Sequence, residues 1–299
     1  MKLAWFGAFI WVGLKWAVAL GFGSFLLTLF LLWRNAHPPR YPYQYPPHPV
    51  IPLEEVTFTT SDGIRLKGSF SWVDPDRPTV LLCHGIGANR TDLYPFAELL
   101  VTKGKMNVFS FDFRAHGESA GSLTSYGALE MRDLASALDF LEGRGLSRNY
   151  GCMGISMGGS VALLVASRDQ RIRAVWVDSP YPDLGESIAI HLRLLYHLPS
   201  FPFLPLAFLS YRLLFGVPIQ EVSPIRSVGK VSPRPLFITS GGADDRMRPA
   251  AMRQLYEEAK DPKDLWIIPG AGHLEGHLLR SSEYDERLLR FFTTALAKP

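Results

Sequence analysis

Cysteine is scarce in this sequence, which excludes a fold held together by disulfides. The 299 residues contain two cysteines, Cys83 and Cys152, and each lies inside an apolar run with the pattern of a buried strand. A disulfide framework needs several cysteines in loops, whereas isolated cysteines in apolar runs are typical of buried free thiols. We therefore expect two buried thiols and a core held by packing, which 47% hydrophobic residues can supply at this length.

Acidic residues are absent from the first fifty positions, although the whole chain is nearly balanced in charge. These positions hold Lys2, Lys15, Arg34 and Arg40, while the whole chain has a formal net charge of +3. Removing these four from the 31 basic residues leaves 27 against 28 acidic residues, a balance of −1. The excess positive charge therefore belongs to the N-terminus, and no basic face for nucleic acid is expected.

Charged residues are also absent from Trp16–Trp33, which lies between Lys15 and Arg34. As a helix these eighteen residues span about 27 Å, close to the hydrocarbon thickness of a bilayer. A cleaved signal peptide is disfavoured because the apolar region is too long and no convincing cleavage site follows, and a core helix fits poorly before a linker. We expect residues 1–34 to be a single-pass membrane anchor, with the upstream Leu3–Leu14 lying along the membrane surface.

The flanking charges do not decide the orientation of this anchor. Lys2 and Lys15 on one side are matched by Arg34 and Arg40 on the other. A short basic start before a long apolar stretch is typical of a signal-anchor, and a folded domain can translocate largely regardless of its flanking charges. We therefore expect the N-terminus inside and the following domain on the extracytoplasmic side.

Proline is concentrated in one short segment. His37–Pro52 contains seven prolines and three tyrosines. This composition excludes a helix or a central strand and favours a semi-rigid, polyproline-like spacer. We expect residues 35–52 to form a linker that holds a separate domain, residues 53–299, off the bilayer.

Strand-like and helical segments alternate through that domain, and no internal repeat is visible. Two alternating runs around Ser61-Asp62-Gly63 predict a β-hairpin, and buried apolar runs separated by helical segments predict a mostly parallel sheet with helices on both faces. The expected strands are Glu55–Thr60, Ile64–Phe70, Thr79–Cys83, Met106–Phe111, Tyr150–Met153, Ile172–Asp178, Pro235–Thr239 and Asp264–Ile268. The expected helices lie near Asp92–Thr102, Tyr126–Leu141, Gly158–Ser167, Pro249–Lys260 and Glu283–Leu296.

One pentapeptide carries the strongest chemical signal. Gly154-Ile155-Ser156-Met157-Gly158 lies between the apolar run Tyr150–Met153 and a second run, Ser160–Ala166. The G-x-S-x-G pattern between a strand and a helix predicts a sharp turn that exposes the serine hydroxyl at its tip. Ser156 is therefore a candidate nucleophile if the chain also supplies a base and an acid.

Other polar motifs follow further strands, where the carboxyl ends of a parallel sheet place catalytic loops. A glycine-containing turn at Ile86 can aim a backbone N–H at a substrate carbonyl, and Met157 supplies a second N–H, which predicts an oxyanion hole. After Ser156 come the adjacent Asp244 and Asp245 and then His273, which is the order nucleophile, acid, base that this architecture imposes. The four motifs are His84-Gly85-Ile86-Gly87, Asp112–Ser119, Gly242-Ala243-Asp244-Asp245 and Gly270-Ala271-Gly272-His273.

Across residues 53–297 the chain resembles the α/β-hydrolase family, in particular its serine esterases, monoacylglycerol-lipase-like lipases and relatives of S9 peptidases. The resemblance implies that Ser156 attacks an acyl carbonyl, that His273 acts as the base and that an aspartate orients the imidazole. The family pattern places this acid four residues before a proline, which selects Asp245 over Asp244. Asp178, after the sixth strand, is an alternative acid in some relatives, but the following Ser179-Pro180 favours a turn cap. Ala115 departs from the glycine that the family usually has there.

Competing site assignments are weaker. His273-Leu274-Glu275-Gly276-His277 matches neither H-E-x-x-H nor H-x-x-E-H, so no metal site is expected. The loop that ends in Arg90 lacks the last glycine of a dinucleotide motif, so no cofactor is expected. His84 and His116 are interpreted as residues that order loops through backbone hydrogen bonds.

Residues 181–232 interrupt the sheet pattern between the sixth and seventh strands, where this family carries a lid. Their apolar part, Leu195–Val217, is consistent with core packing, an acyl-chain pocket or a surface against the bilayer. We expect a membrane-anchored serine hydrolase that cleaves small-molecule or lipid esters. A peptidase or thioesterase with the same three residues, and a non-catalytic binding protein of this fold, remain alternatives.

Overall fold

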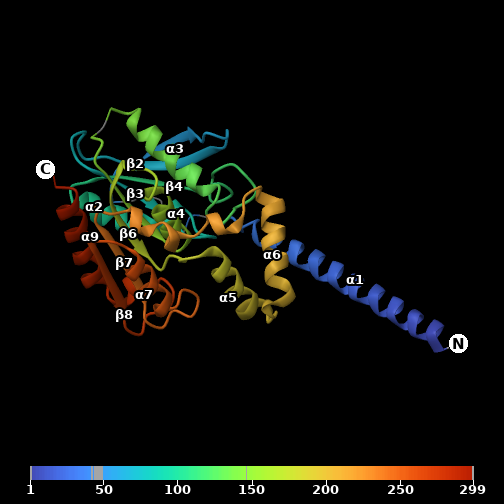
Figure 1. The fold of residues 1–299 in the computed structure, drawn as a ribbon. Coiled ribbons are helices and arrows are strands. Elements are labelled where there is room, and N and C mark those ends of the chain that lie inside the picture. Colours follow the sequence, from blue (N-terminus) through green and yellow to red (C-terminus); the bar gives the residue numbers. More distant parts are fainter. Residues whose placement is uncertain (1, 42, 44–49, 146, 298–299) are drawn as a thin grey trace.

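The computed structural model describes residues 2–41, 43, 50–145 and 147–297, and its centre is an eight-stranded sheet (Figure 1). The strand order is β1-β2-β4-β3-β5-β6-β7-β8. The strands are β1 (Glu54–Thr59), β2 (Arg65–Ser71), β3 (Thr79–Cys83), β4 (Asn107–Phe111), β5 (Tyr150–Ile155), β6 (Ile172–Asp178), β7 (Leu236–Gly241) and β8 (Lys263–Ile268).

The sheet is antiparallel at one edge and parallel elsewhere. β1 and β2 form the expected hairpin, and β2 runs antiparallel to β4. All pairs from β4 through β3, β5, β6 and β7 to β8 are parallel. The carboxyl ends of these strands therefore meet at one edge, and the predicted α/β-hydrolase fold is confirmed.

Helices cover both faces of the sheet, because the central strands are buried on both sides. On one face α2 (Tyr94–Thr102) and α9 (Ser281–Ala295) pack on alternate residues such as Val80 and Trp176. On the other face the covering helices are α3 (Glu130–Glu142), α4 (Met157–Ala166) and α7 (Pro249–Glu258). The shorter elements are η1 (Arg90–Leu93), η2 (Ile219–Glu221), η3 (Pro224–Arg226), η4 (Val228–Lys230) and α8 (Gly276–Leu279).

The first helix, α1 (Lys2–Asn35), projects away from the rest of the molecule (Figure 1). Its segment Trp11–Asn35 is long and apolar enough to cross a membrane, with a mean hydropathy of 1.9 and 17% of the apolar window buried. Its C-terminal part packs against the domain through Thr28 and Leu32, which are buried and lie one turn apart on one side of the helix. The helix is continuous from Lys2, so residues 3–14 extend the same helix toward the N-terminus.

Two helices lie between β6 and β7, inside the segment where a lid is expected. They are α5 (Leu184–Tyr196) and α6 (Ser200–Phe215), and α6 is the helix against which α1 packs. The Tyr196 hydroxyl accepts hydrogen bonds from Arg34 Nη2 at 2.8 Å and from Asn35 Nδ2 at 2.7 Å. Helices α5 and α6 therefore join the apolar helix α1 to the domain.

The described part of the linker lies on the domain, which corrects the expectation of a spacer that holds the domain away. Ala36 and Ile51 are buried, and the Ala36 carbonyl accepts a hydrogen bond from the backbone N–H of Thr124 at 2.8 Å. The side chains of Arg40 and Tyr43 also bond to loops of the domain. Proline excludes regular secondary structure here, but it leaves carbonyls and side chains free to bind a neighbouring surface. Residues 42 and 44–49 of the linker lie outside the described residues.

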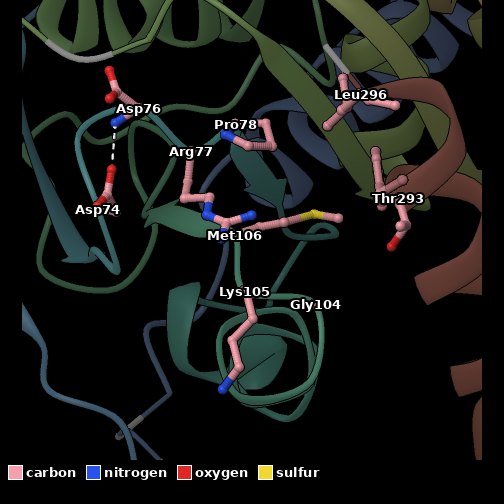
Figure 2. A pocket seen from close by; sticks show the side chains of 11 residues that line it. Asp74, Asp76, Arg77, Pro78, Gly104, Lys105, Met106, Thr293 and Leu296 are labelled. Carbon is pink, nitrogen blue, oxygen red and sulfur yellow. Dashed lines mark hydrogen bonds between the residues drawn. The ribbon is translucent and has the colours of Figure 1, made fainter.

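A pocket of about 550 Å³ lies at the edge of the sheet opposite the loops predicted to be catalytic (Figure 2). It is formed by residues that precede β3 and β4 and by the C-terminal turns of α9. Its lining includes Asp74, Asp76, Arg77, Lys105, Met106 and Thr293. Because Ser156 follows the carboxyl end of β5, the sheet separates this pocket from the candidate active site described next.

Candidate active site

Ser156 occupies the sharp turn that its pentapeptide predicts. β5 ends at Ile155 and α4 begins at Met157, so one residue connects them, with φ 49° and ψ −119°. This backbone is strained for a residue with a side chain, and it turns the serine away from both elements. The backbone N–H of Ser156 donates to the Asp178 carbonyl at 2.8 Å, which fixes the turn to β6.

The glycines on both sides of Ser156 permit this turn. A Cβ atom on Gly158 would lie 2.1 Å from the Cys83 carbonyl oxygen, and one on Gly154 would lie 2.4 Å from the Gly158 oxygen. No side chain fits at such distances, so the pattern reflects close packing between β5, α4 and β3. Glycine at these positions is therefore a requirement of the turn.

A hydrogen-bonded chain connects Ser156, His273 and Asp244. His273 follows β8, and its Nε2 lies 3.1 Å from Ser156 Oγ. Its Nδ1 lies 2.7 Å from Asp244 Oδ2, in the loop after β7. The Asp244 side chain is fully buried, whereas that of His273 is 14% exposed. This arrangement can move a proton from the hydroxyl to the imidazole while the carboxylate holds the other ring nitrogen.

The prediction that Asp245 contacts His273 is wrong, because Asp244 occupies that place. Asp245 is exposed and Asp244 is buried. The second oxygen of Asp244 accepts the backbone N–H groups of Arg246 at 2.9 Å and Met247 at 2.8 Å. These bonds form a tight turn that directs the other oxygen at the imidazole. These two hydrogen bonds, and not the count back from Pro249, select Asp244.

Asp178 lies near this chain without bonding to it. Its carboxylate accepts hydrogen bonds from the Tyr284 hydroxyl at 2.8 Å and the Ser179 hydroxyl at 2.9 Å. Burial raises the pKa of Asp178 to about 6, although these two hydrogen bonds favour the charged form. His273 bonds to Asp244 instead, so the geometry favours Asp178 as a support of the β6 turn.

The loop that follows β3 faces Ser156. A Cβ atom on Gly85 would lie 3.3 Å from the Ser156 Cβ, so the loop and the serine are in contact. His84 orders this loop, since its Nδ1 lies 2.7 Å from the Gly85 carbonyl and its Nε2 accepts the Phe113 N–H at 3.0 Å. Burial lowers the pKa of His84 well below its usual value, which keeps the ring neutral and able to accept. Met157 follows Ser156 directly in the chain, and Ile86 follows Gly85, the residue that lies against Ser156.

Histidine has an ordering role elsewhere too. His116 Nδ1 lies 2.9 Å from the Arg114 carbonyl, so the loop-ordering interpretation of His84 and His116 is confirmed.

The polar side chains around His273 bond to other groups of the domain. Glu275 accepts the Gly272 N–H at 2.8 Å, while His277 Nε2 lies 3.1 Å from Asp285. Across the described ranges no group of three or more His, Cys, Asp or Glu side chains is arranged to hold a metal ion.

The two cysteines are free and buried, as expected. They lie on neighbouring strands, β3 and β5, with their Sγ atoms 3.8 Å apart. Burial raises the pKa of Cys83 well above its usual value, which keeps it a thiol.

Comparison with known proteins gives one consistent result. The sequence profile described as the alpha/beta hydrolase family matches residues 80–288, more than half of the chain. The "Uncharacterized protein YqkD" of Bacillus subtilis is 33% identical over 245 residues, which are 80% of this chain and 79% of that protein. The "Uncharacterized protein YfhR" of Escherichia coli K12 is 30% identical over 253 residues, 81% of each chain.

Among solved structures, the esterase Pf2001 of Pyrococcus furiosus superposes with a TM-score of 0.71 and 26% identity. The match covers 87% of this chain and all of that chain. The family profile runs from Val80 in β3 to Leu288 in α9, and therefore includes every loop that forms the site described above. By sequence profile, relatives and fold, this chain belongs to the alpha/beta hydrolase family.

Proposed function

We propose that this protein is a membrane-anchored serine hydrolase that cleaves carboxylic esters through an acyl-enzyme intermediate. The hydrogen-bonded chain from Asp244 through His273 to Ser156 is the observation that carries the proposal. A serine hydroxyl at its usual pKa is a weak nucleophile, and a neighbouring imidazole removes its proton as attack begins. The resemblance of fold to an esterase supports the same chemistry.

In the first half of the reaction, Ser156 Oγ attacks the ester carbonyl carbon and His273 Nε2 takes the hydroxyl proton. The carbonyl π bond breaks onto oxygen, and the backbone N–H groups of Ile86 and Met157 stabilise the negative charge. Asp244 keeps Nδ1 protonated and stabilises the imidazolium. Collapse of the intermediate breaks the ester C–O bond, and His273 gives its proton to the departing alcohol.

In the second half, water attacks the acyl carbon of the ester formed on Ser156. His273 takes a proton from the water, the oxyanion hole again holds the negative charge, and the bond to Ser156 Oγ breaks. Return of the proton to Oγ restores the enzyme and releases the carboxylic acid. No cofactor is required for either half.

The apolar helix supports a membrane anchor. Residues 11–23 of α1 are exposed and, apart from Lys15, apolar, and Trp16, Leu20 and Phe22 are each more than 60% exposed. Apolar surface of this extent is stable in lipid and unfavourable in water. Arg34, at the end of the helix, is placed to remain in the interface as a basic flank.

The outer face of the lid supports a lipid ester as substrate. On α6, Leu209 and Leu213 are 48% and 63% exposed and lie one turn apart, and Phe201 at its start is 81% exposed. These exposed residues belong to the same helix against which the proposed anchor α1 packs. An apolar helix face next to a spanning helix is stabilised at the bilayer surface, from which a long acyl chain can enter.

We expect the purified full-length protein in detergent to react with a fluorophosphonate probe and to hydrolyse p-nitrophenyl esters and monoacylglycerols faster than aminoacyl amides. An amide is a poorer substrate because its nitrogen is a worse leaving group. Initial rates over this panel measure the preference. Faster cleavage of amides would favour a peptidase, and absence of both labelling and turnover would favour a binding protein of this fold.

For the orientation of the anchor, we expect protease added to intact cells or spheroplasts to digest the catalytic domain. The N-terminus would then be inside, as a signal-anchor places it. Immunoblotting against the C-terminal end measures the digestion, and a cytoplasmic marker protein should stay intact as the control. Protection of the domain until detergent is added would show the reverse orientation.

A further inference from the structure

The linker after α1 binds the loop that follows β4. The Arg40 guanidinium donates to the carbonyl oxygens of Gly117 and Ser119 at 2.7 Å and of Gly121 at 2.8 Å. Three carbonyls directed at one guanidinium fix the path of this loop, which we call loop 112–121. Charge-assisted bonds of this kind are stronger than neutral ones.

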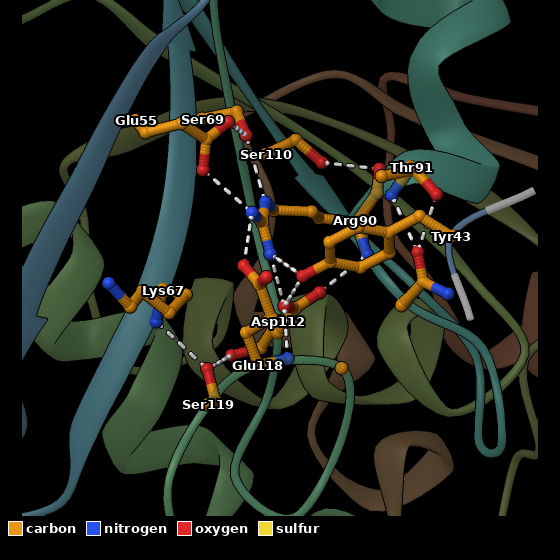
Figure 3. Close-up of polar contacts among 12 residues, drawn as sticks. Tyr43, Glu55, Lys67, Ser69, Arg90, Thr91, Ser110, Asp112, Glu118 and Ser119 are labelled. Atoms are coloured by element: carbon orange, nitrogen blue, oxygen red, sulfur yellow. Dashed lines mark hydrogen bonds and ion pairs between the residues drawn. The ribbon is translucent and has the colours of Figure 1, made fainter. Parts of the chain in front are cut away.

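Tyr43, three residues further along, reaches the start of the same loop (Figure 3). Its hydroxyl donates to Asp112 Oδ2 at 2.9 Å and accepts a hydrogen bond from Arg90 Nη1. The Arg90 guanidinium also lies over the Tyr43 ring, 4.6 Å from its centroid. Burial and the nearby Asp112 charge raise the pKa of Tyr43 above its usual range, so the phenol remains a neutral donor.

Arg90 is the centre of this cluster and is itself buried, with 3% of its side chain exposed. It forms ion pairs with Asp112, Glu55 and Glu118. Its backbone N–H donates to Asp112 Oδ1 at 2.7 Å, so one carboxylate bonds both the side chain and the backbone of Arg90. Tyr43 of the linker therefore bonds both members of the Asp112–Arg90 pair.

Arg90 ends the loop that carries the proposed oxyanion donor. Loop 84–90 begins at His84, which bonds the backbone of Phe113, and passes Ser156 at Gly85. It is thus held at both ends by loop 112–121, through Phe113 and Asp112. A Cβ atom on Gly87 would lie 4.0 Å from the Tyr41 ring, so the linker also borders the middle of loop 84–90.

We propose that Arg40 and Tyr43 are positioning residues for the oxyanion loop, so that the linker is part of the active-site support. An oxyanion donor acts only when it lies close to the position that the negative charge will occupy, and small displacements reduce its effect steeply. The linker fixes loop 112–121 through Arg40 and the Asp112–Arg90 pair through Tyr43. The inference rests on the proposed function and assigns a role to residues that lie outside the family profile.

The test uses the full-length protein in detergent, with Tyr43→Phe as the variant and Tyr150→Phe as its matched control. Both changes remove one phenolic hydroxyl, but Tyr150 lies at the start of β5, at the opposite end of that strand from Ser156, and its hydroxyl has no hydrogen-bond partner among the described residues. For Tyr43→Phe we expect kcat for p-nitrophenyl butyrate to fall about fivefold with KM within about twofold of wild type. Binding of a trifluoromethyl ketone, whose adduct with Ser156 carries an oxyanion, should weaken by the same factor as kcat. Arg40→Met should show the same pattern.

The outcomes separate this inference from the proposed function. Values of kcat and inhibitor affinity for Tyr43→Phe and Arg40→Met that match Tyr150→Phe would overturn it. A lower Tm with unchanged kcat and inhibitor affinity would also overturn it, because the contacts would then be structural only. A wild-type protein with neither fluorophosphonate labelling nor esterase activity would remove the proposed function itself, and the inference with it.

Discussion

Replacement of Ser156 by alanine is expected to abolish ester hydrolysis and fluorophosphonate labelling while the fold persists. The hydroxyl is the atom that forms the covalent intermediate, and no other described hydroxyl is bonded to His273. Removing a member of such a triad typically lowers kcat by about 10⁴–10⁶-fold. Steady-state hydrolysis of p-nitrophenyl butyrate and gel-based labelling measure the loss, and circular dichroism and Tm report on the fold.

Ser160→Ala is the matched control for this change. Ser160 lies one turn further along α4 and is buried, and its hydroxyl donates to the Tyr181 carbonyl at 2.9 Å. Loss of one hydrogen bond should lower stability by about 1 kcal/mol and leave labelling intact. A Ser156→Ala protein that hydrolyses esters within tenfold of wild type would contradict the assignment of the nucleophile.

Replacement of Asp244 by asparagine is expected to lower kcat by about 10³–10⁴-fold, whereas Asp245→Asn should stay within about threefold of wild type. In Asp244→Asn the new amide would present either its oxygen or its NH₂ group to His273, and the NH₂ group selects the tautomer that cannot accept the serine proton. Asp245 is exposed, and His273 Nδ1 bonds to Asp244 instead. The pH profiles of kcat and kcat/KM for both variants measure the effect.

The adjacent aspartates make this an internally controlled comparison, since the same change is made one residue apart. Equal, small effects at both positions together with a large loss for Asp178→Asn would move the acid to the end of β6. A large loss only at Asp245 would show that the loop rearranges when substrate binds. The structure predicts neither, because the two backbone N–H groups that bond Asp244 hold its carboxylate in place.

The start of helix α3 shows the limit of what a local sequence pattern predicts. A helix is expected from Tyr126, but α3 begins at Glu130. Tyr126 and Gly127 both have positive φ, 58° and 130°, and the Glu130 carboxylate accepts the Gly127 N–H at 2.7 Å. The apolar periodicity continues through this turn, but the helical backbone conformation does not. The Glu130 carboxylate instead bonds N–H groups that precede the helix. Periodicity reports which face is buried and does not report how a helix begins.

The sequence alone determined the features that depend on local residue type and spacing. The pattern of apolar residues predicted all eight strands. Parallel strands covered on both faces need apolar side chains throughout, whereas the strands of a hairpin with one buried face alternate apolar and polar side chains. The glycines around Ser156 and the position of His273 after the last strand predicted which two side chains meet. Each of these signals lies within a few residues, where steric requirements act directly.

Only the tertiary structure decided between Asp244 and Asp245 and placed the linker on the domain. Asp244 and Asp245 are the same residue type, one position apart. The choice between them therefore depends on which carboxylate the loop turns toward the imidazole of His273. A proline-rich segment likewise has no regular structure of its own, and its path follows from the surface that it meets. In this chain that surface is formed by loop 112–121 and Arg90, which are distant in sequence and are brought together by the sheet.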